Sequence, residues 1–134
     1  MTIKIVVMGR SALPEGVEFP LLEAARYSWE EYLQLTRQDL VDRCWRADVV
    51  VILGGGIRID GELLDKLGRL KLLIIPTSAM VQIGREVAAA RGIVLREHSE
   101  GEDRDIGSAQ ALCTRISALI DAWLSDSCAT GSPS

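Results

Sequence analysis

The sequence predicts an α/β fold, a three-layer sandwich around a five-stranded parallel sheet in the strand order 2-1-3-4-5. Three short runs between Ala47 and Leu95 are rich in β-branched residues and almost wholly apolar, which is typical of strands buried on both faces of a parallel sheet. Two segments with helical spacing separate these runs, so we expect a strand–helix–strand–helix–strand unit with right-handed crossovers. The three predicted strands are Asp48–Leu53, Lys71–Ile75 and Ile93–Leu95.

Two more strands are predicted before this unit. The apolar run Ile3–Met8 ends at Gly9 and is expected to be the central first strand. Tyr27–Tyr32 alternates aromatic and polar side chains, which indicates a half-exposed strand at the edge of the sheet. With the second strand at the edge and the first in the centre, the predicted order is that of a flavodoxin-like fold.

Three helices are predicted between the strands from apolar residues at helical spacing. Thr36 precedes the first helix, and its hydroxyl can accept the backbone N–H of Asp39 as an N-cap. The second helix follows Asp60, and Gly92 closes the third helix at its C′ position. The residues expected on the buried faces are Leu40, Val41, Cys44 and Trp45 in the first helix, Leu63, Leu64 and Leu67 in the second, and Ile83, Val87 and Ala90 in the third.

The C-terminal part of the chain contains the strongest helical pattern. Arg96–Asp105 is polar and is expected to be a solvated loop, and a helix is predicted over Gly107–Leu124. Ser125–Ser134 is small and polar and is predicted to be a disordered tail, so residues 1–124 form one domain. Apolar residues crowd the end of the helix and predict a homodimer, or a contact with a partner protein, at this place. The alternative is that the sheet of the same domain covers all of these residues. The predicted interface residues are Leu119, Ile120 and Trp123.

The composition excludes several classes of protein. The chain has 134 residues, 48% of them hydrophobic, and a net charge of −4, which argues against a nucleic-acid-binding surface. No apolar run is long enough for a signal peptide or a membrane span. Cys44, Cys113 and Cys128 lack C-x-x-C spacing, which indicates reduced thiols in a cytoplasmic protein. These cysteines lie on separate segments, so no metal site is predicted.

Three segments of the chain resemble a known enzyme family. The segments "ADVVVI", "LLDKLGRLKLLII" and "EVAAARGIVL" are similar to the N-terminal substrate domain of the D-isomer-specific 2-hydroxyacid dehydrogenases, particularly the glycerate dehydrogenase type. The resemblance reaches back to Ile3–Leu13 and forward to the helix near Ser108. In such enzymes a nicotinamide-binding Rossmann domain follows, and the catalytic Arg, acidic residue and His lie within and after it. These 134 residues do not include that region, so the resemblance implies no catalytic residue and no cofactor on this chain. His98, the single histidine, precedes the region and is expected to be solvated.

The loop after the third predicted strand is a candidate binding site. In an open α/β sheet, ligands bind beyond the carboxyl ends of the strands, where the strand order reverses. This loop begins with Gly54, Gly55 and Gly56 and contains Arg58, so its backbone N–H groups and guanidinium could hold a carboxylate or a phosphate. The alternative is a plain turn that leaves a buried strand. Neither G-x-x-x-x-G-K-[ST] nor G-x-G-x-x-G occurs in the chain.

A second candidate loop, Pro76–Gly84, follows the fourth predicted strand. In the family that the chain resembles, this position reads A-T-G-x-D-N-[VI]-D, and its backbone amides hold the substrate carboxylate. Here Ala79 stands in place of the glycine, so the turn is expected to have changed shape. Ser78 could contact a ligand or could simply cap the next helix. The residues predicted to contact a ligand are Ser78, Ala79, Met80 and Gln82.

Two hypotheses for the function follow from these features. In the first, the chain is a free-standing, non-catalytic homologue of the dehydrogenase substrate domain, a pseudoenzyme that binds a partner protein or a small carboxylate. In the second, it is the substrate-domain subunit of an NAD(P)-dependent oxidoreductase acting on a 2-hydroxy acid, and another chain supplies the cofactor domain. The missing glycine-rich motif and the altered loop at Ala79 favour the first hypothesis.

Overall fold

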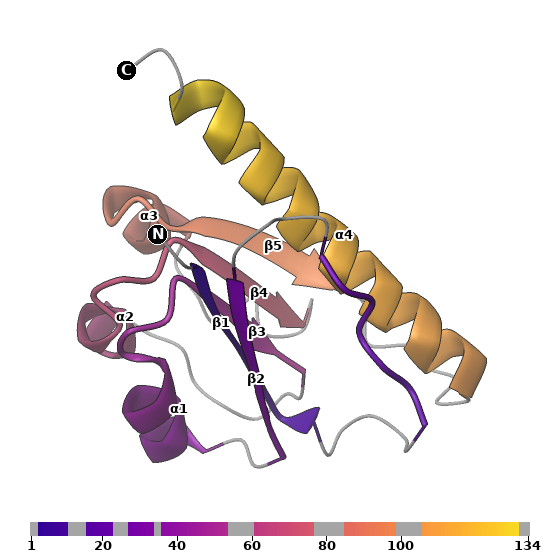
Figure 1. The fold of residues 1–134 in the computed structure, drawn as a ribbon. Coiled ribbons are helices and arrows are strands. Elements are labelled where there is room, and N and C mark those ends of the chain that lie inside the picture. The colour runs from indigo at the N-terminus through magenta and orange to yellow at the C-terminus, as the bar shows by residue number, and fades with distance from the viewer. Residues whose placement is uncertain are drawn as a thin grey trace.

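The structure, a computed structural model, describes residues 3–10, 16–22, 27–33, 36–53, 61–76, 85–98 and 106–131. These residues form nine regular elements (Figure 1). The strands are β1 (Ile3–Met8), β2 (Tyr27–Tyr32), β3 (Val49–Ile52), β4 (Leu72–Pro76) and β5 (Val94–His98), and the helices are α1 (Arg37–Cys44), α2 (Gly61–Lys66), α3 (Arg85–Ala90) and α4 (Ile106–Gly131).

The five strands are all parallel and form one sheet in the order β2-β1-β3-β4-β5, which confirms the predicted flavodoxin-like topology. Met8 in β1 lies opposite both Tyr32 in β2 and Ile52 in β3. Val51 in β3 is in turn opposite Ile74 in β4. Because the strands are parallel and in register, their carboxyl ends meet at one edge of the sheet.

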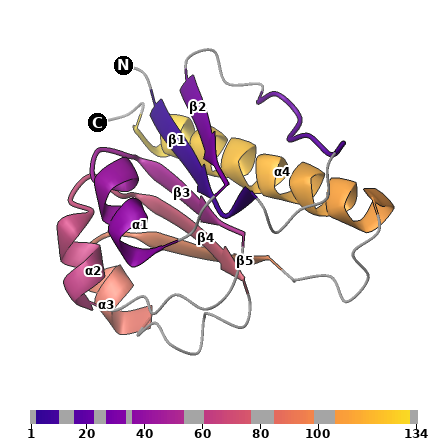
Figure 2. The same cartoon turned by 90° about the horizontal axis from the view of Figure 1, so that it is seen from below.

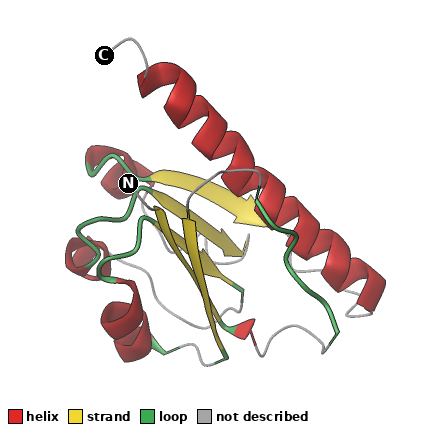
Figure 3. Ribbon diagram, viewed as in Figure 1, coloured by secondary structure: helices red, strands yellow, loops and turns green. Residues whose placement is uncertain are grey.

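The sheet is the middle of three layers (Figure 1, Figure 2). Helices α1, α2 and α3 cover one face, and α4 together with residues 17–22 covers the other face. Figure 3 shows α4 as one long helix that runs across the sheet against the direction of the strands. No helix in the described part of the chain is both long enough and apolar enough to span a membrane.

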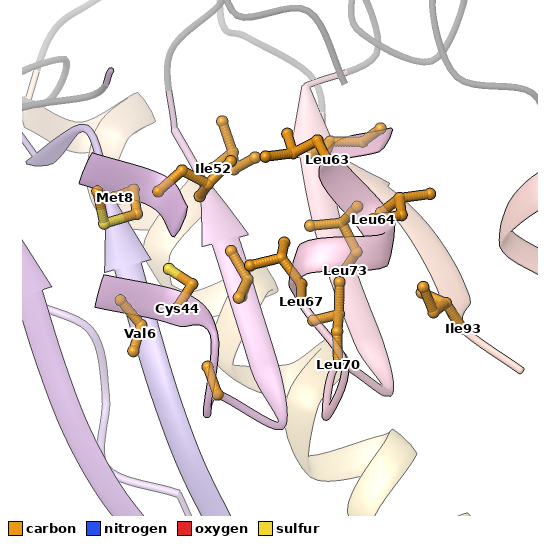
Figure 4. Packing of buried hydrophobic residues seen from close by; sticks show 14 of the residues in the cluster. Val6, Met8, Cys44, Ile52, Leu63, Leu64, Leu67, Leu70, Leu73 and Ile93 are labelled. Carbon is orange, nitrogen blue, oxygen red and sulfur yellow. The ribbon is translucent and has the colours of Figure 1, made fainter. Parts of the chain in front are cut away.

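The face of the sheet towards α1, α2 and α3 carries the larger core (Figure 4). Successive side chains of a strand point to opposite faces, so every second strand residue belongs to this cluster. Complete burial of one such aliphatic side chain contributes roughly 1.5–3 kcal/mol relative to exposure. The cluster contains Val6, Met8, Val50, Ile52, Leu73 and Ile75 from the strands and Leu40, Cys44, Leu63, Leu64, Leu67 and Leu70 from the helices and connections.

The opposite face of the sheet packs against α4. Ile116 and Ile120 are fully buried there, and Leu119 and Trp123 are partly buried against the same cluster. The sheet of the same domain therefore covers much of the apolar stripe of α4. Ile120, one of the residues predicted to lie in an interface, is fully buried against the sheet of its own domain. The strand residues of the cluster are Ile5, Val7, Val49, Val51, Leu72 and Ile74.

Two predicted helix ends are confirmed. The hydroxyl of Thr36 accepts the backbone N–H of Asp39 at 3.0 Å and caps α1. Gly92 has a φ of 72°, a left-handed conformation that favours glycine, and it follows α3. The backbone N–H groups of Gly92 and Ile93 donate to Ala89 and Ala88 at 3.0 and 2.9 Å, which is the Schellman arrangement of a helix C-terminus.

Two side chains predicted to be buried are exposed. Trp45 is 50% exposed because α1 ends at Cys44 and the helical spacing stops there. The guanidinium of Arg46 stacks on its ring at 4.3 Å from the centroid. Ala90 is also exposed, and Ala88, at 1% exposure, is the residue that α3 buries. Of the other predicted residues of that stripe, Ile83 and the side chain of Val87 lie outside the described part of the chain.

Two elements are longer than predicted. Strand β5 continues to His98, so Arg96–His98 is not loop, because the backbone ladder with β4 persists where the side chains become polar. β5 is at the edge of the described sheet, and its backbone hydrogen bonds to β4 do not depend on apolar side chains. Helix α4 continues to Gly131, so residues 125–131 of the predicted disordered tail are helical. Propagating a helix adds one backbone hydrogen bond per residue and does not require an apolar face.

Residues 17–22 cross the face of α4 without regular structure, and side chains of α4 hold their backbone. The amide of Gln110 accepts the N–H of Glu18 at 3.1 Å and donates to its carbonyl at 2.8 Å. Two turns further on, the hydroxyl of Ser117 donates to the carbonyl of Pro20 at 3.1 Å. Between them, Cys113 packs against Val17, and both are fully buried. These contacts replace the ladder bonds that a strand would make.

We expect Gln110→Ala to lower the free energy of unfolding by about 1–2 kcal/mol, because two hydrogen bonds to the backbone of Glu18 are lost together. Thr114→Ala is the matched control, since its hydroxyl bonds only to the carbonyl of Gln110 within the helix. The control should change the free energy by less than about 0.5 kcal/mol. Urea unfolding measures both variants, and equal losses would contradict a role for Gln110 in holding residues 17–22.

Candidate functional site

The carboxyl edge of the sheet contains the point where the strand order reverses. The chain passes from β1 to the edge strand β2 and then returns across β1 to form β3 on its other side. Connections that leave β1 and β3 therefore diverge, which opens a crevice between these two strands in folds of this kind. The described residues nearest to this point are those that follow Met8 and Ile52.

Gly9 sets the backbone at this point. It is buried and has a φ of 84°, which a residue with a Cβ adopts only under strain. Its N–H donates to the carbonyl of Tyr32 at 3.1 Å, and the N–H of Leu53 donates to the carbonyl of Met8 at 3.0 Å. The three strands β2, β1 and β3 are thus joined up to their last residues, and the turn after β1 starts from a fixed position.

Arg10 is the charged residue next to this turn. Its Nε lies 2.9 Å from a carboxylate oxygen of Glu31 in β2, and its Nη2 donates to the carbonyl of Val17. The Arg10 side chain is 18% exposed. Arg10 therefore joins the carboxyl end of β2 to residues 17–22, and Glu31 balances its charge. Its contacts make it a positioning residue of this edge.

Aromatic residues line a pocket beside Arg10. The indole N–H of Trp29 donates to Glu31 at 2.8 Å, and its ring lies 5.3 Å from that of Phe19 and 6.4 Å from that of Tyr27, between centroids. The phenol oxygen of Tyr27 accepts the backbone N–H of Leu22 at 3.2 Å. The pocket encloses about 520 Å³ between β2 and residues 18–21. The hydrogen bonds to Glu31 and from Leu22 give these rings fixed positions.

A second pair of polar groups lies on the other face of β2. The hydroxyl of Tyr32 donates to the carboxylate of Glu30 at 2.8 Å, and Lys4 lies 3.3 Å from the same carboxylate. The hydrogen bond from Tyr32 lowers the pKa of Glu30 and raises the pKa of Tyr32. The guanidinium of Arg43 lies 4.9 Å from the centre of the Tyr32 ring. The charged form of the Glu30 carboxylate is thus favoured by its neighbours.

The predicted ligand-binding residues lie outside the described part of the chain. These are Gly54, Gly55, Gly56 and Arg58 after β3, and Ser78, Ala79, Met80 and Gln82 after β4. The strands that lead into both loops are described, and β3 and β4 are neighbours in the sheet. The two loops therefore start from adjacent strand ends at the carboxyl edge. Their roles remain predictions.

His98 is the last residue of β5 and is paired with Pro76 at the carboxyl edge of the sheet; its side chain is outside the described set. Arg10 and Glu31 are not among the site residues predicted from the sequence. One signal for Arg10 was available, because it directly follows the glycine that ends the central strand. The pairing with Glu31 depends on the parallel register of β1 and β2, in which Val7 is opposite Glu31.

No group of three His, Cys, Asp or Glu among the described residues could hold a metal ion.

Comparison with known proteins identifies one curated relative. Over 94 residues, 70% of this chain, the sequence is 27% identical to a Haemophilus influenzae protein assigned to the 2-hydroxyacid dehydrogenases. The matched region is 29% of that protein, so this chain spans about three-tenths of its relative. No protein-family model matches the sequence.

Two solved structures share the fold. One is the pyruvate reductase of Chlamydomonas reinhardtii, with a TM-score of 0.52 and 12% identity over 74% of this chain and 30% of that one. The other is a Ralstonia solanacearum protein assigned as a D-3-phosphoglycerate dehydrogenase, with a TM-score of 0.53 and 18% identity over the same shares of the two chains. At these identities the structures support the fold alone.

The described cysteines are not activated nucleophiles. Cys44 and Cys113 are free thiols and fully buried. Burial raises the pKa of the Cys44 thiol to about 12 and also raises the pKa of Cys113. The thiolate is the reactive form, so neither group offers covalent chemistry near neutral pH. Cys44 packs in the core under α1, α2 and α3, and Cys113 packs against Val17 and Ala109.

We expect the free energy of unfolding to fall as the pH rises above about 9, because the Cys44 thiol ionises in the unfolded chain well before it ionises in the fold. Between pH 8 and pH 10 the loss attributable to Cys44 should be on the order of 1 kcal/mol. Urea unfolding at the two pH values measures it against Cys44→Ala, which lacks this titration. The same pH dependence in both proteins would exclude Cys44 as its source.

Proposed function

We propose that this chain, a homologue of the D-isomer 2-hydroxyacid dehydrogenases over about three-tenths of their length, binds a small 2-hydroxy or 2-oxo carboxylate and does not itself transfer hydride. The observation that carries the proposal is the 94-residue match to the Haemophilus influenzae protein. The extent of the match is consistent with the substrate domain of such enzymes. The ligand class follows from the reaction that the name of the relative describes.

The carboxyl edge of the sheet is the proposed binding site. Two loops leave it from the neighbouring strands β3 and β4, and each contains backbone N–H groups or side chains suited to an oxyanion. A bound carboxylate also needs a cation in reach. Arg10 is engaged with Glu31 and Val17, so we assign this role to Arg58 in the loop after β3. A guanidinium can hold both carboxylate oxygens at once.

The absence of hydride transfer is proposed from the chemistry of the cofactor. Nicotinamide dinucleotides are held by a glycine-rich turn that leads directly into a helix N-terminus. The sequence contains no G-x-G-x-x-G pattern in these 134 residues. A cofactor domain on another polypeptide would leave the carboxylate site on this chain unchanged and would supply the hydride. The two tests below separate carboxylate binding from catalysis.

Wild-type protein should bind D-glycerate or pyruvate saturably, and Arg58→Ala should weaken binding by about tenfold or more, because a charge-assisted contact is lost. Arg69→Ala is the matched control. Arg69 lies in the connection between α2 and β4, at the amino edge of the sheet, and its loss should leave the affinity unchanged. Calorimetric titration measures all three proteins. If neither acid binds, or if both variants lose affinity equally, the carboxyl-edge site is wrong.

The purified chain should not oxidise NADH or NADPH in the presence of pyruvate, because its sequence has no G-x-G-x-x-G pattern to hold the pyrophosphate of the dinucleotide. The loss of NADH absorbance over hours measures this, with a complete D-2-hydroxyacid dehydrogenase as the positive control. Turnover by the purified chain alone would contradict the proposal. Turnover that appears only with a second protein would support the alternative in which another chain holds the cofactor.

A further inference from the structure

Strand β2 is an edge strand of the sheet, next to β1 (Figure 2). Among the described residues, its backbone bonds only to β1 and to Gly9, which follows β1. Natural edge strands are usually protected from further pairing by lysine, proline, a bulge or a covering segment. β2 contains neither lysine nor proline, and its register with β1 runs through all six residues without a bulge. Its own sequence and geometry therefore do not prevent a further strand from pairing with it.

The two carboxylates of β2 are balanced within the domain. Glu30 lies 3.3 Å from the ammonium of Lys4, and Glu31 lies 2.9 Å from the guanidinium of Arg10. Like charges that face one another across two strands oppose pairing. Because each glutamate of β2 already has a cation beside it, this opposition is reduced for a strand that approaches from the open side.

Exposed apolar side chains lie near both ends of β2. Leu33 directly follows the strand and is 63% exposed. Leu21 is 86% exposed and lines the aromatic pocket together with Tyr27 and Trp29 of β2. Apolar surface that gathers in this way is typical of an interaction surface. The open side of β2 therefore combines unpaired backbone with apolar side chains.

One hydrogen bond shows which residues of β2 direct their backbone towards the open side. The N–H of Gly9 donates to the carbonyl of Tyr32 at 3.1 Å, so Tyr32 directs its carbonyl towards β1. The N–H and C=O of one strand residue point to the same side, and successive residues alternate between the two sides. Every second residue counted from Tyr32 therefore faces β1. The residues whose backbone groups face the open side are Tyr27, Trp29 and Glu31.

We propose that the protein forms a two-fold homodimer in which β2 pairs in the antiparallel direction with β2 of a second copy, so that the two sheets become one. A two-fold axis perpendicular to the sheet keeps each face of the sheet on its own side. In the proposed register, Trp29 lies opposite Trp29 of the second copy, and Tyr27 lies opposite Glu31. These residues have their backbone groups on the open side, so they exchange about six hydrogen bonds.

Charge favours this register and a second copy as the occupant. In the proposed register, Glu30 lies opposite Ser28, and Glu31 lies opposite the phenol of Tyr27, so no two charges of one sign are directly opposed. A shift by two residues would instead place Glu30 opposite Glu30 of the second copy, which is unfavourable. Each contact occurs twice by symmetry. β2 is therefore complementary to itself, as a two-fold contact requires.

Ser28 allows a test in which only an exposed side chain is changed. It is exposed, and its neighbour in β1 is Lys4. Ser28→Glu would place a carboxylate opposite Glu30 of the second copy, and Ser28→Lys would place an ammonium there. Within one copy, the new glutamate would lie beside Lys4, and the new lysine would be repelled by it. The effects on the fold and on the dimer therefore have opposite signs and can be separated.

The experiment is sedimentation equilibrium of the full chain, which measures the dissociation constant of the dimer. Wild type should be dimeric at tens of micromolar protein. Ser28→Glu should dimerise more weakly than wild type and Ser28→Lys at least as tightly, and the two variants should differ by about tenfold or more. Ala118→Glu and Ala118→Lys are the matched controls, because Ala118 is exposed on α4, and they should leave the constant unchanged. Circular dichroism and urea unfolding check that all four variants fold.

Three results of this experiment would overturn the proposal. The first is a wild-type protein that sediments as a monomer, and the second is a dimer that responds equally to both charges at Ser28. The third is a dimer that responds to the charge at Ala118 and not to the charge at Ser28, which would place the interface on α4. The interface follows β2 and not the loops after β3 and β4, so failure here leaves the proposed carboxylate site untouched.

Amide hydrogen exchange tests the backbone pairing directly. The N–H groups of Trp29 and Glu31 should exchange more slowly at high protein concentration than at low concentration, because the second copy binds them. The N–H groups of Ser28 and Glu30 face β1 in both states and should show no such dependence. NMR resolves the individual amides. The absence of this alternation in a dimeric protein would also contradict pairing through β2.

Discussion

Burial of both faces of the parallel sheet is the constraint on which the rest of the structure depends. Val50, Val51 and Ile74 have no exposed surface, so their backbone groups can pair only within the sheet. Parallel strands also cannot be joined by tight turns, so each connection must cross a face and cover it. Three helices do this on one side. On the other side α4 does most of it, and residues 17–22 complete the cover only because Gln110 and Ser117 bond to their backbone.

With both faces closed, polar chemistry is left to the two edges of the sheet, and the edges differ. At the carboxyl edge, Arg10 and Glu31 balance each other and fix the turn after β1. At the amino edge, Arg91 is paired with Asp65 of α2, and Arg69 lies 3.9 Å from Asp48. The arginine at the carboxyl edge thus fixes a turn, whereas those at the amino edge join the connections to neighbouring carboxylates.

Residues of the proposed sites differ in how far sequence could predict them. The loops after β3 and β4 were predicted because ligand sites follow the carboxyl ends of strands, and strand order could be inferred from apolar runs. The pairing of Arg91 with Asp65 was not predicted, because the two residues are far apart in the sequence and only the packing of α2 beside α3 brings them together. Arg10 was missed for the same reason, since its partner Glu31 is on another strand.

By itself, the sequence determined the fold class, the strand order, the cap at Thr36 and the closing glycine Gly92, because each follows from local spacing or from one residue's backbone preference. The tertiary structure alone decided where β5 and α4 end, since backbone hydrogen bonds extend both elements beyond their apolar residues. It also decided that Ile120 belongs to the core and that Trp45 does not. Side-chain pattern reports which residues avoid water, and only packing determines what covers them.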